Sequence, residues 1–135
     1  MMIINRTQVN SNLRDYITAI LSKHTLLVTD ACFSGGNFKM RSAESVSAYA
    51  TSKLYQLPSR KALTSGTLTK VPDESVFIKY LMKRLDENQE AYLPVSQLFY
   101  SIRPAILNNS STVPQLGVIQ NTGDEGGEFV FIKRQ

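Results

Sequence analysis

Hydrophobic residues occur in short blocks along this chain, and the spacing within the blocks indicates alternating helices and strands. Leu13, Ile17 and Leu21 recur at helical spacing after the capping side chains of residues 10–12, which predicts a helix of about ten residues. Residues 25–29 are then short, apolar and partly β-branched, which predicts a fully buried strand.

The remainder of the chain continues this alternation. We predict further strands at residues 61–65 and 128–133, and amphipathic helices over residues 73–85 and 94–108. Residues 42–57 are polar and weakly patterned, and are either a helix or a loop. Strands that alternate with helices predict an α/β fold with a sheet that is parallel in large part and flanked by helices.

The strand at residues 25–29 has no clear partner earlier in the sequence. Only three strong strands are predicted, and none precedes this one. Native chains cover or pair apolar strand edges, because unpaired edges promote aggregation. We therefore expect a segment from outside this chain to cover the strand.

Composition and charge limit the classes of protein to which this chain can belong. The chain has 135 residues, 42% of them hydrophobic, which fits one domain over residues 1–135. Its net charge of +4 is scattered over the sequence and forms no long basic run, so we read a solvated surface rather than a nucleic-acid stripe. Apolar runs, such as residues 26–28 and 129–132, are too short to span a membrane, and the N-terminus lacks a signal-peptide core. A single cysteine is compatible with a reducing, cytoplasmic setting.

That cysteine, Cys32, is the first candidate for chemistry. It follows the buried strand within the turn Asp-Ala-Cys-Phe-Ser-Gly-Gly at residues 30–36, where open α/β sheets bind ligands. The turn can present the sulfur together with backbone N–H groups at Cys32 and Gly35, which could stabilise an oxyanion. Spacing alone leaves the alternative open that Cys32 is a small buried core residue.

Residues 23–35, Lys-His-Thr-Leu-Leu-Val-Thr-Asp-Ala-Cys-Phe-Ser-Gly, resemble the nucleophile strand of the caspase and metacaspase superfamily of cysteine peptidases. The pattern is most similar to that of bacterial caspase homologues. It departs from the animal caspase signature in having Asp30 in place of Gln, and from most metacaspases in having Phe33 in place of His. The resemblance continues through residues 59–66, 71–77, 98–99, 113–115 and 123–132.

The resemblance implies the C-terminal part of a caspase-like α/β sandwich, without its N-terminal strands, and a cysteine endopeptidase with Cys32 as nucleophile. In such peptidases the catalytic histidine lies about 50 residues upstream of the cysteine, whereas only 31 residues precede Cys32 here. The one histidine, His24, would lie more than roughly 20 Å from the Cys32 sulfur if the strand runs straight. We expect His24 to be a boundary residue, and the catalytic histidine to come from an N-terminal, large-subunit-like segment or partner chain.

The resemblance also implies substrate specificity. Asp30 stands where metacaspase-like enzymes place a carboxylate for a P1 arginine or lysine, which such a group binds well. Ser65 and Gly66, at the end of the next strand, are expected to line the same pocket. Each has an alternative: Asp30 as a turn residue accepting backbone N–H bonds, and Ser65–Gly66 as an ordinary turn. Asp73 is better explained as a helix cap than as a second pocket carboxylate.

Further expectations concern cofactors, the acidic loop and the C-terminal strand. We expect no metal or other cofactor, although calcium dependence is left open, and we read the loop at residues 123–127 as structural, with contact to substrate or a cation as its alternative. The apolar strand at residues 129–132 could pair across a homodimer. The competing functional hypotheses are a catalytically inactive caspase-fold module that acts by assembly, and an unrelated α/β binding protein.

Overall fold

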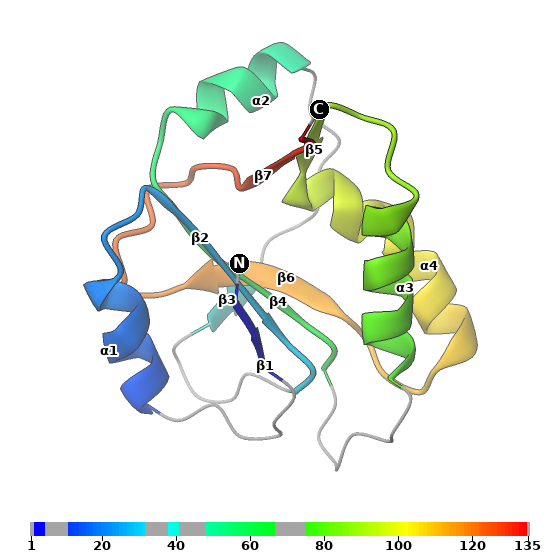
Figure 1. Ribbon diagram of the computed structural model, residues 1–135. Helices are drawn as coiled ribbons and strands as arrows, with labels where there is room; N and C mark the ends of the chain where they lie inside the picture. Colours follow the sequence, from blue (N-terminus) through cyan, green and yellow to red (C-terminus); the bar gives the residue numbers. More distant parts are fainter. Residues whose placement is uncertain (1, 5–10, 32–37, 41–47, 67–74, 135) are drawn as a thin grey trace.

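A five-stranded sheet forms the centre of the protein (Figure 1). The computed structural model describes residues 2–4, 11–31, 38–40, 48–66 and 75–134. The strands lie in the order β1-β2-β4-β6-β3. Their bounds are Met2–Ile4 for β1, His24–Thr29 for β2, Phe38–Met40 for β3, Ser59–Thr64 for β4 and Gln115–Ile119 for β6.

The sheet is mixed, so the expectation of a largely parallel sheet is wrong. β1, β2 and β4 run parallel, whereas β6 is antiparallel to both β4 and β3. The helices between β4 and β6 explain the reversal. The chain leaves the end of β4, runs through α3 (Val76–Asp86), and returns through α4 (Val95–Asn109), which packs against α3. α3 carries the chain away from the end of β4 and α4 carries it back. β6 therefore starts beside the end of β4 and runs antiparallel to it.

Helices cover the two faces of the sheet (Figure 1). α3 and α4 lie side by side on one face and enclose the main core, to which the sheet contributes Leu26, Val28 and Leu63. α1 (Ser11–Ala19) lies on the other side, where Ile17 is 1% exposed and the alternating Leu27 is fully buried. The predicted helices and the strands at residues 25–29 and 61–65 are thus confirmed with shifts of a few residues. Residues 42–57 were predicted to be either a helix or a loop, and α2 (Ala48–Tyr55) lies within them.

The strand beside β2 belongs to this chain. β1 pairs with β2 in parallel register, Ile3 opposite Val28, and β4 occupies the other side of β2. The expectation that a segment from outside the chain covers β2 is therefore wrong. The pairing was not visible in the sequence because a three-residue strand is too short to show a period.

The C-terminal strand lies outside the main sheet. β7 (Val130–Ile132) does not join the main sheet but pairs with β5 (Tyr92–Pro94) in a separate two-stranded antiparallel sheet. β5 leads directly into α4, so the small sheet lies beside the start of that helix. The apolar pattern at residues 128–133 correctly indicates a strand, but a pattern does not specify the partner.

Candidate functional site

The carboxyl ends of β2 and β4 bring together three of the predicted site residues. The parallel ladder continues beyond both strands, with Ser65 N–H donating to the Thr29 carbonyl at 3.1 Å and Gly66 N–H to the Ala31 carbonyl at 3.3 Å. Asp30 therefore lies beside Ser65 and Gly66, at the edge where open sheets bind ligands. Cys32, the residue after Ala31, and Gly35 lie outside the described residues.

Asp30 combines burial with an unsatisfied oxygen. The residue is 2% exposed, and its Oδ2 atom is buried without a hydrogen-bond partner among the residues that the structure describes. Ser65, its neighbour across the ladder, is fully buried. A carboxylate removed from water is costly unless a cation or hydrogen-bond donor compensates it. The arrangement is thus suited to a cationic group that approaches the carboxyl ends of the strands.

Gly66 is required by a close approach as well as by its turn. Its φ is +75°, a left-handed conformation that side-chain-bearing residues rarely adopt. A Cβ atom at this position would lie 2.3 Å from the backbone carbonyl oxygen of Val113. Gly66 therefore lets the segment that leads into β6 pack directly against the end of β4.

The other described acidic candidate, Asp124, lies at the amino end of β4 and not at this site. Asp73 lies outside the described residues, and the N-cap of α3 is instead Ser75, whose Oγ accepts from Ile78 N–H at 3.2 Å. Asp124, in the loop at residues 123–127, accepts from Arg60 N–H at 2.7 Å and from Gly126 N–H at 3.0 Å. Both carboxylate oxygens of Asp124 are thus used to hold the start of β4, which supports the structural interpretation of that loop.

His24 lies at the amino end of β2, as predicted. Its Nδ1 is 2.8 Å from Ser59 Oγ, and its ring stacks on Tyr55 with centroids 4.5 Å apart and an interplanar angle of 17°. Burial lowers the pKa of the imidazole below its ordinary value, and the positive charges of Lys23 and Arg60 lower it further. Since β2 runs from His24 to Thr29 at about 3.3 Å per residue, the ring lies at the opposite end of the strand from Asp30.

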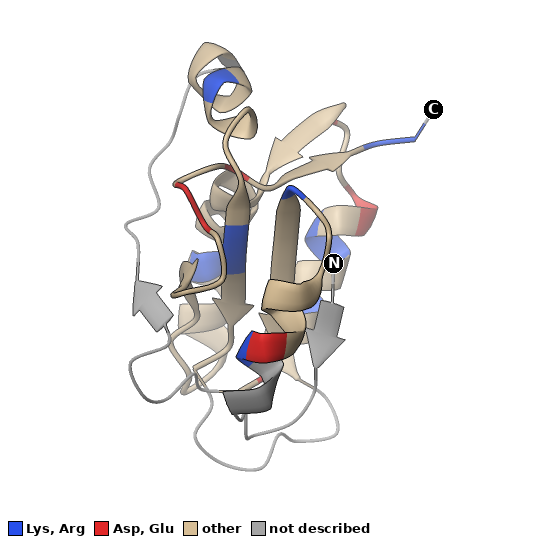
Figure 2. Ribbon diagram, turned by 90° about the vertical axis from the view of Figure 1, so that its left-hand side faces the viewer, with Lys and Arg blue, Asp and Glu red and all other residues tan. Residues whose placement is uncertain are grey.

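Two basic residues that the sequence places on the surface are buried. Arg60 is 8% exposed and Lys61 is 4% exposed. The Arg60 guanidinium donates to the backbone carbonyls of Lys23 and Ser59, at 2.9 Å each. Lys61 pairs with Glu128. The expectation of a solvated basic surface is therefore wrong for Arg60 and Lys61. A single sequence does not show that backbone carbonyls or a carboxylate contact these two cations. Figure 2 shows the other basic residues on several separate elements.

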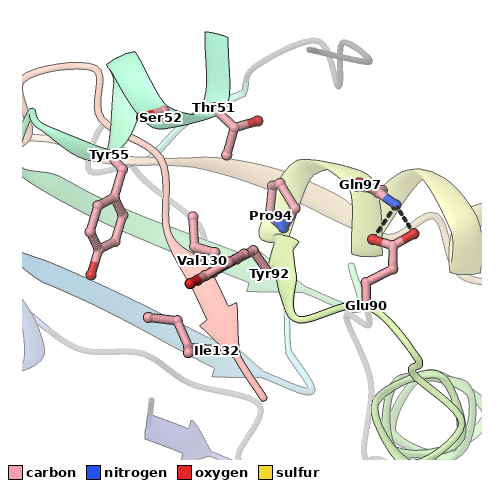
Figure 3. A pocket seen from close by; sticks show the side chains of 9 residues that line it. All are labelled: Thr51, Ser52, Tyr55, Glu90, Tyr92, Pro94, Gln97, Val130 and Ile132. Atoms are coloured by element: carbon pink, nitrogen blue, oxygen red, sulfur yellow. Dashed lines mark hydrogen bonds between the residues drawn. The ribbon is translucent and has the colours of Figure 1, made fainter. Parts of the chain in front are cut away.

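A cavity of about 390 Å³ lies between α2 and the small β5–β7 sheet (Figure 3). It is on the side of the amino end of β2, because Tyr55 of its lining stacks on His24. α2 forms one wall, and the small β5–β7 sheet with the start of α4 forms the other. Its lining residues are Thr51, Ser52, Tyr55, Glu90, Tyr92, Pro94, Gln97, Val130 and Ile132. The sequence did not predict this cavity, since its walls come from three separate segments and carry no shared motif.

None of the helices in the described part of the chain has both the length and the hydrophobicity that a membrane span requires. No three His, Cys, Asp or Glu side chains within the described ranges lie close enough together to hold a metal ion. No protein-family model matches the sequence, and neither the curated proteins nor the solved structures include a significant match.

Proposed function

We propose that this chain is the nucleophile-bearing part of a caspase-like cysteine endopeptidase that cleaves after arginine or lysine. The observation that best supports the proposal is the buried Asp30 carboxylate, whose Oδ2 has no partner among the described residues. A P1 guanidinium or ammonium group would supply both the missing charge and the missing hydrogen bond. Because Asp30 lies two residues before Cys32 in the sequence, a P1 side chain bound to Asp30 would bring the carbonyl group of the same P1 residue toward the sulfur.

In this proposal Cys32 attacks as a thiolate. Its sulfur adds to the peptide carbonyl carbon, and backbone N–H groups of the turn at Cys32 and Gly35 stabilise the resulting oxyanion. The C–N bond then breaks, and the leaving amine takes a proton from the histidine that had deprotonated the thiol. Water hydrolyses the thioester and regenerates Cys32. Ser65 and Gly66 line the place where the P1 side chain enters.

The histidine must come from another segment or a partner chain in this scheme. His24 is the only histidine in the sequence, and it lies at the far end of β2. Both sides of β2 are occupied, by β1 and by β4. A histidine-bearing strand would therefore either displace the three-residue β1 or add to its outer edge.

The proposal is tested by reconstitution. We would mix the chain with a separate polypeptide that carries a His-Gly turn after a strand, and measure cleavage of a fluorogenic peptide with P1 arginine. Cleavage that requires both chains and is lost in Cys32→Ala is the expected result. Asp30→Asn should reduce kcat/KM for P1 arginine by at least about a hundredfold, whereas the exposed Asp86→Asn should leave it unchanged. Cleavage that persists in Cys32→Ala, or by the chain alone, would contradict the proposal.

A second candidate is a catalytically inactive caspase-fold module that acts by assembly. The pairing of β1 with β2 favours it, because β1 already occupies the edge of β2 where a partner strand would otherwise be needed. In that case the reconstituted mixture would show a stable complex but no cleavage, and Asp30→Asn would leave assembly unchanged.

A further inference from the structure

The cavity beside α2 plays no part in the proposed peptidase mechanism. It lies toward the amino ends of β2 and β4, whereas Asp30, Ser65 and Gly66 lie at their carboxyl ends. Its floor is the face of the β5–β7 sheet that points away from the core. Figure 3 shows Tyr55 on the α2 side of the space, facing Tyr92 and Val130 across it.

Two hydrogen bonds fix which backbone groups of β7 face its partner strand. Val95 N–H donates to the Phe129 carbonyl at 2.8 Å, and Lys133 N–H donates to the Ala91 carbonyl at 2.9 Å. In an antiparallel pair, hydrogen-bonded positions alternate with positions whose N–H and C=O groups point outward. Position 131 is therefore bonded to β5, and positions 130 and 132 are not.

The outer edge of β7 consequently presents an unpaired row of backbone groups. The N–H and C=O groups of Val130 and Ile132 point away from β5, and no described residue pairs with them. Pro94, opposite Val130, fits this register, since its position needs no N–H in the ladder. Such a row of alternating donors and acceptors is complementary to an extended polypeptide strand.

The side chains next to this edge form an apolar floor. Tyr92, Pro94, Val130 and Ile132 share one face of the small sheet and line the cavity. Tyr92 is 67% exposed and Ile132 is 58% exposed. Every second side chain of a strand added to β7 would project onto the same face, and so toward the cavity.

The cavity also carries a negative charge. Glu90 is the only charged residue among the described residues that line it. Gln97 Nε2 lies 2.9 Å from each of the Glu90 carboxylate oxygens, which orients that carboxylate without neutralising it. The rings of Tyr55 and Tyr92 and the apolar floor suit the aliphatic part of a long side chain, while Glu90 suits a cation at its tip. Lysine and arginine are the side chains with that combination.

We propose that the outer edge of β7 and the adjacent cavity bind an extended segment of a partner protein, whose lysine or arginine side chain enters the cavity toward Glu90. The site is separate from the proposed active site and does not depend on peptidase activity. It would allow this chain to hold a partner polypeptide by main-chain pairing at one end of the sheet while the other end remains open.

Fluorescence anisotropy with short labelled peptides tests this. The probe is an acetylated and amidated Val-Thr-Arg-Val-Thr peptide, and its control carries the neutral isostere citrulline in place of arginine. The protein carries Cys32→Ala and Asp30→Asn, so that neither cleavage nor the proposed P1 pocket interferes. We expect saturable binding of the arginine peptide below about 1 mM, with the citrulline peptide about tenfold weaker. Absence of binding, or equal binding of the two peptides, would overturn the proposal.

Three further comparisons locate the binding. Glu90→Gln should abolish the difference between the peptides, whereas Glu87→Gln, outside the cavity, should preserve it. N-methylation of peptide amides should weaken binding at every second position only, which requires no change in the protein. A uniform effect of N-methylation would place the peptide outside a strand pairing and would refute this site.

Discussion

Lys61 and Glu128 form an ion pair inside the protein, with Nζ and Oε1 3.5 Å apart and side chains 6% and 3% exposed. Glu128 Oε2 also accepts from Ser96 Oγ at 2.8 Å, and Phe129 N–H donates to Glu128 Oε1 at 3.2 Å. The carboxylate thus joins β4 to the start of α4 and to the segment that enters β7. It connects the main sheet with the small sheet that forms the cavity.

Single substitutions in this pair should be far more costly than the double substitution. Glu128→Gln or Lys61→Met alone leaves one buried charge without its partner, and we expect each to lower the free energy of unfolding by about 3–5 kcal/mol. Lys61→Met with Glu128→Gln removes both charges and should cost less than either single change. Urea unfolding of the four proteins measures these values as a double-mutant cycle. Additive costs would show that the two charges do not interact.

Gly66→Ala should destabilise the protein more than Gly123→Ala. Both glycines have positive φ, at +75° and +99°, so alanine introduces backbone strain of about 1–2 kcal/mol at each position. At Gly66 the new Cβ also meets the Val113 carbonyl oxygen, at 2.3 Å, whereas no described atom lies within 4 Å of a Cβ at Gly123. We expect Gly66→Ala to cost at least about 3 kcal/mol in urea unfolding. Equal costs at the two positions would mean that the contact relaxes freely.

The positions of the site residues could be predicted from sequence to a useful extent. Asp30 and Ser65 follow apolar runs that are short enough to be strands, and the carboxyl ends of adjacent parallel strands meet at one edge of a sheet. The ladder does place Asp30 beside Ser65. Whether Asp30 binds substrate stays a prediction, because it depends on Cys32, which lies outside the described residues.

The features that the sequence did not reveal depend on contacts between distant segments. β1 is too short to show a period, and its pairing with β2 joins residues more than twenty positions apart. The buried state of Lys61 depends on Glu128, far along the chain. The antiparallel direction of β6 follows from the presence of two helices before it, and the number of crossings is a property of the topology rather than of any local pattern.

Stability should fall as the pH is lowered through the range below about 6.5, because of His24. Burial lowers the pKa of this imidazole in the folded protein, so the unfolded chain takes up the proton first. The contribution of His24 is complete above its unfolded pKa, decreases as the pH falls below that value, and levels off below the folded pKa. Urea unfolding at about pH 7.5 and about pH 5.5 should show a smaller decrease for His24→Gln than for the unchanged chain. Identical decreases would exclude His24 as the titrating group.

Deletion of residues 1–4 should uncover one edge of β2. β1 pairs with β2 through Met2, Ile3 and Ile4, so its removal leaves the backbone opposite Leu27 to Thr29 without a strand on that side. We expect a loss of about 1–2 kcal/mol in stability and faster amide exchange in β2 than in β4. Deletion of residues 134–135 at the other terminus serves as the control and should change neither.

The same deletion also distinguishes the two ways in which a histidine-bearing strand could join the sheet. If that strand takes the place of β1, the shortened chain should bind it more tightly and cleave the P1 arginine peptide faster in the reconstituted mixture, because no strand has to be displaced first. If the strand adds to the outer edge of β1 instead, the deletion removes its template and should abolish assembly. Size-exclusion chromatography of the mixture, together with the cleavage rate, separates these outcomes.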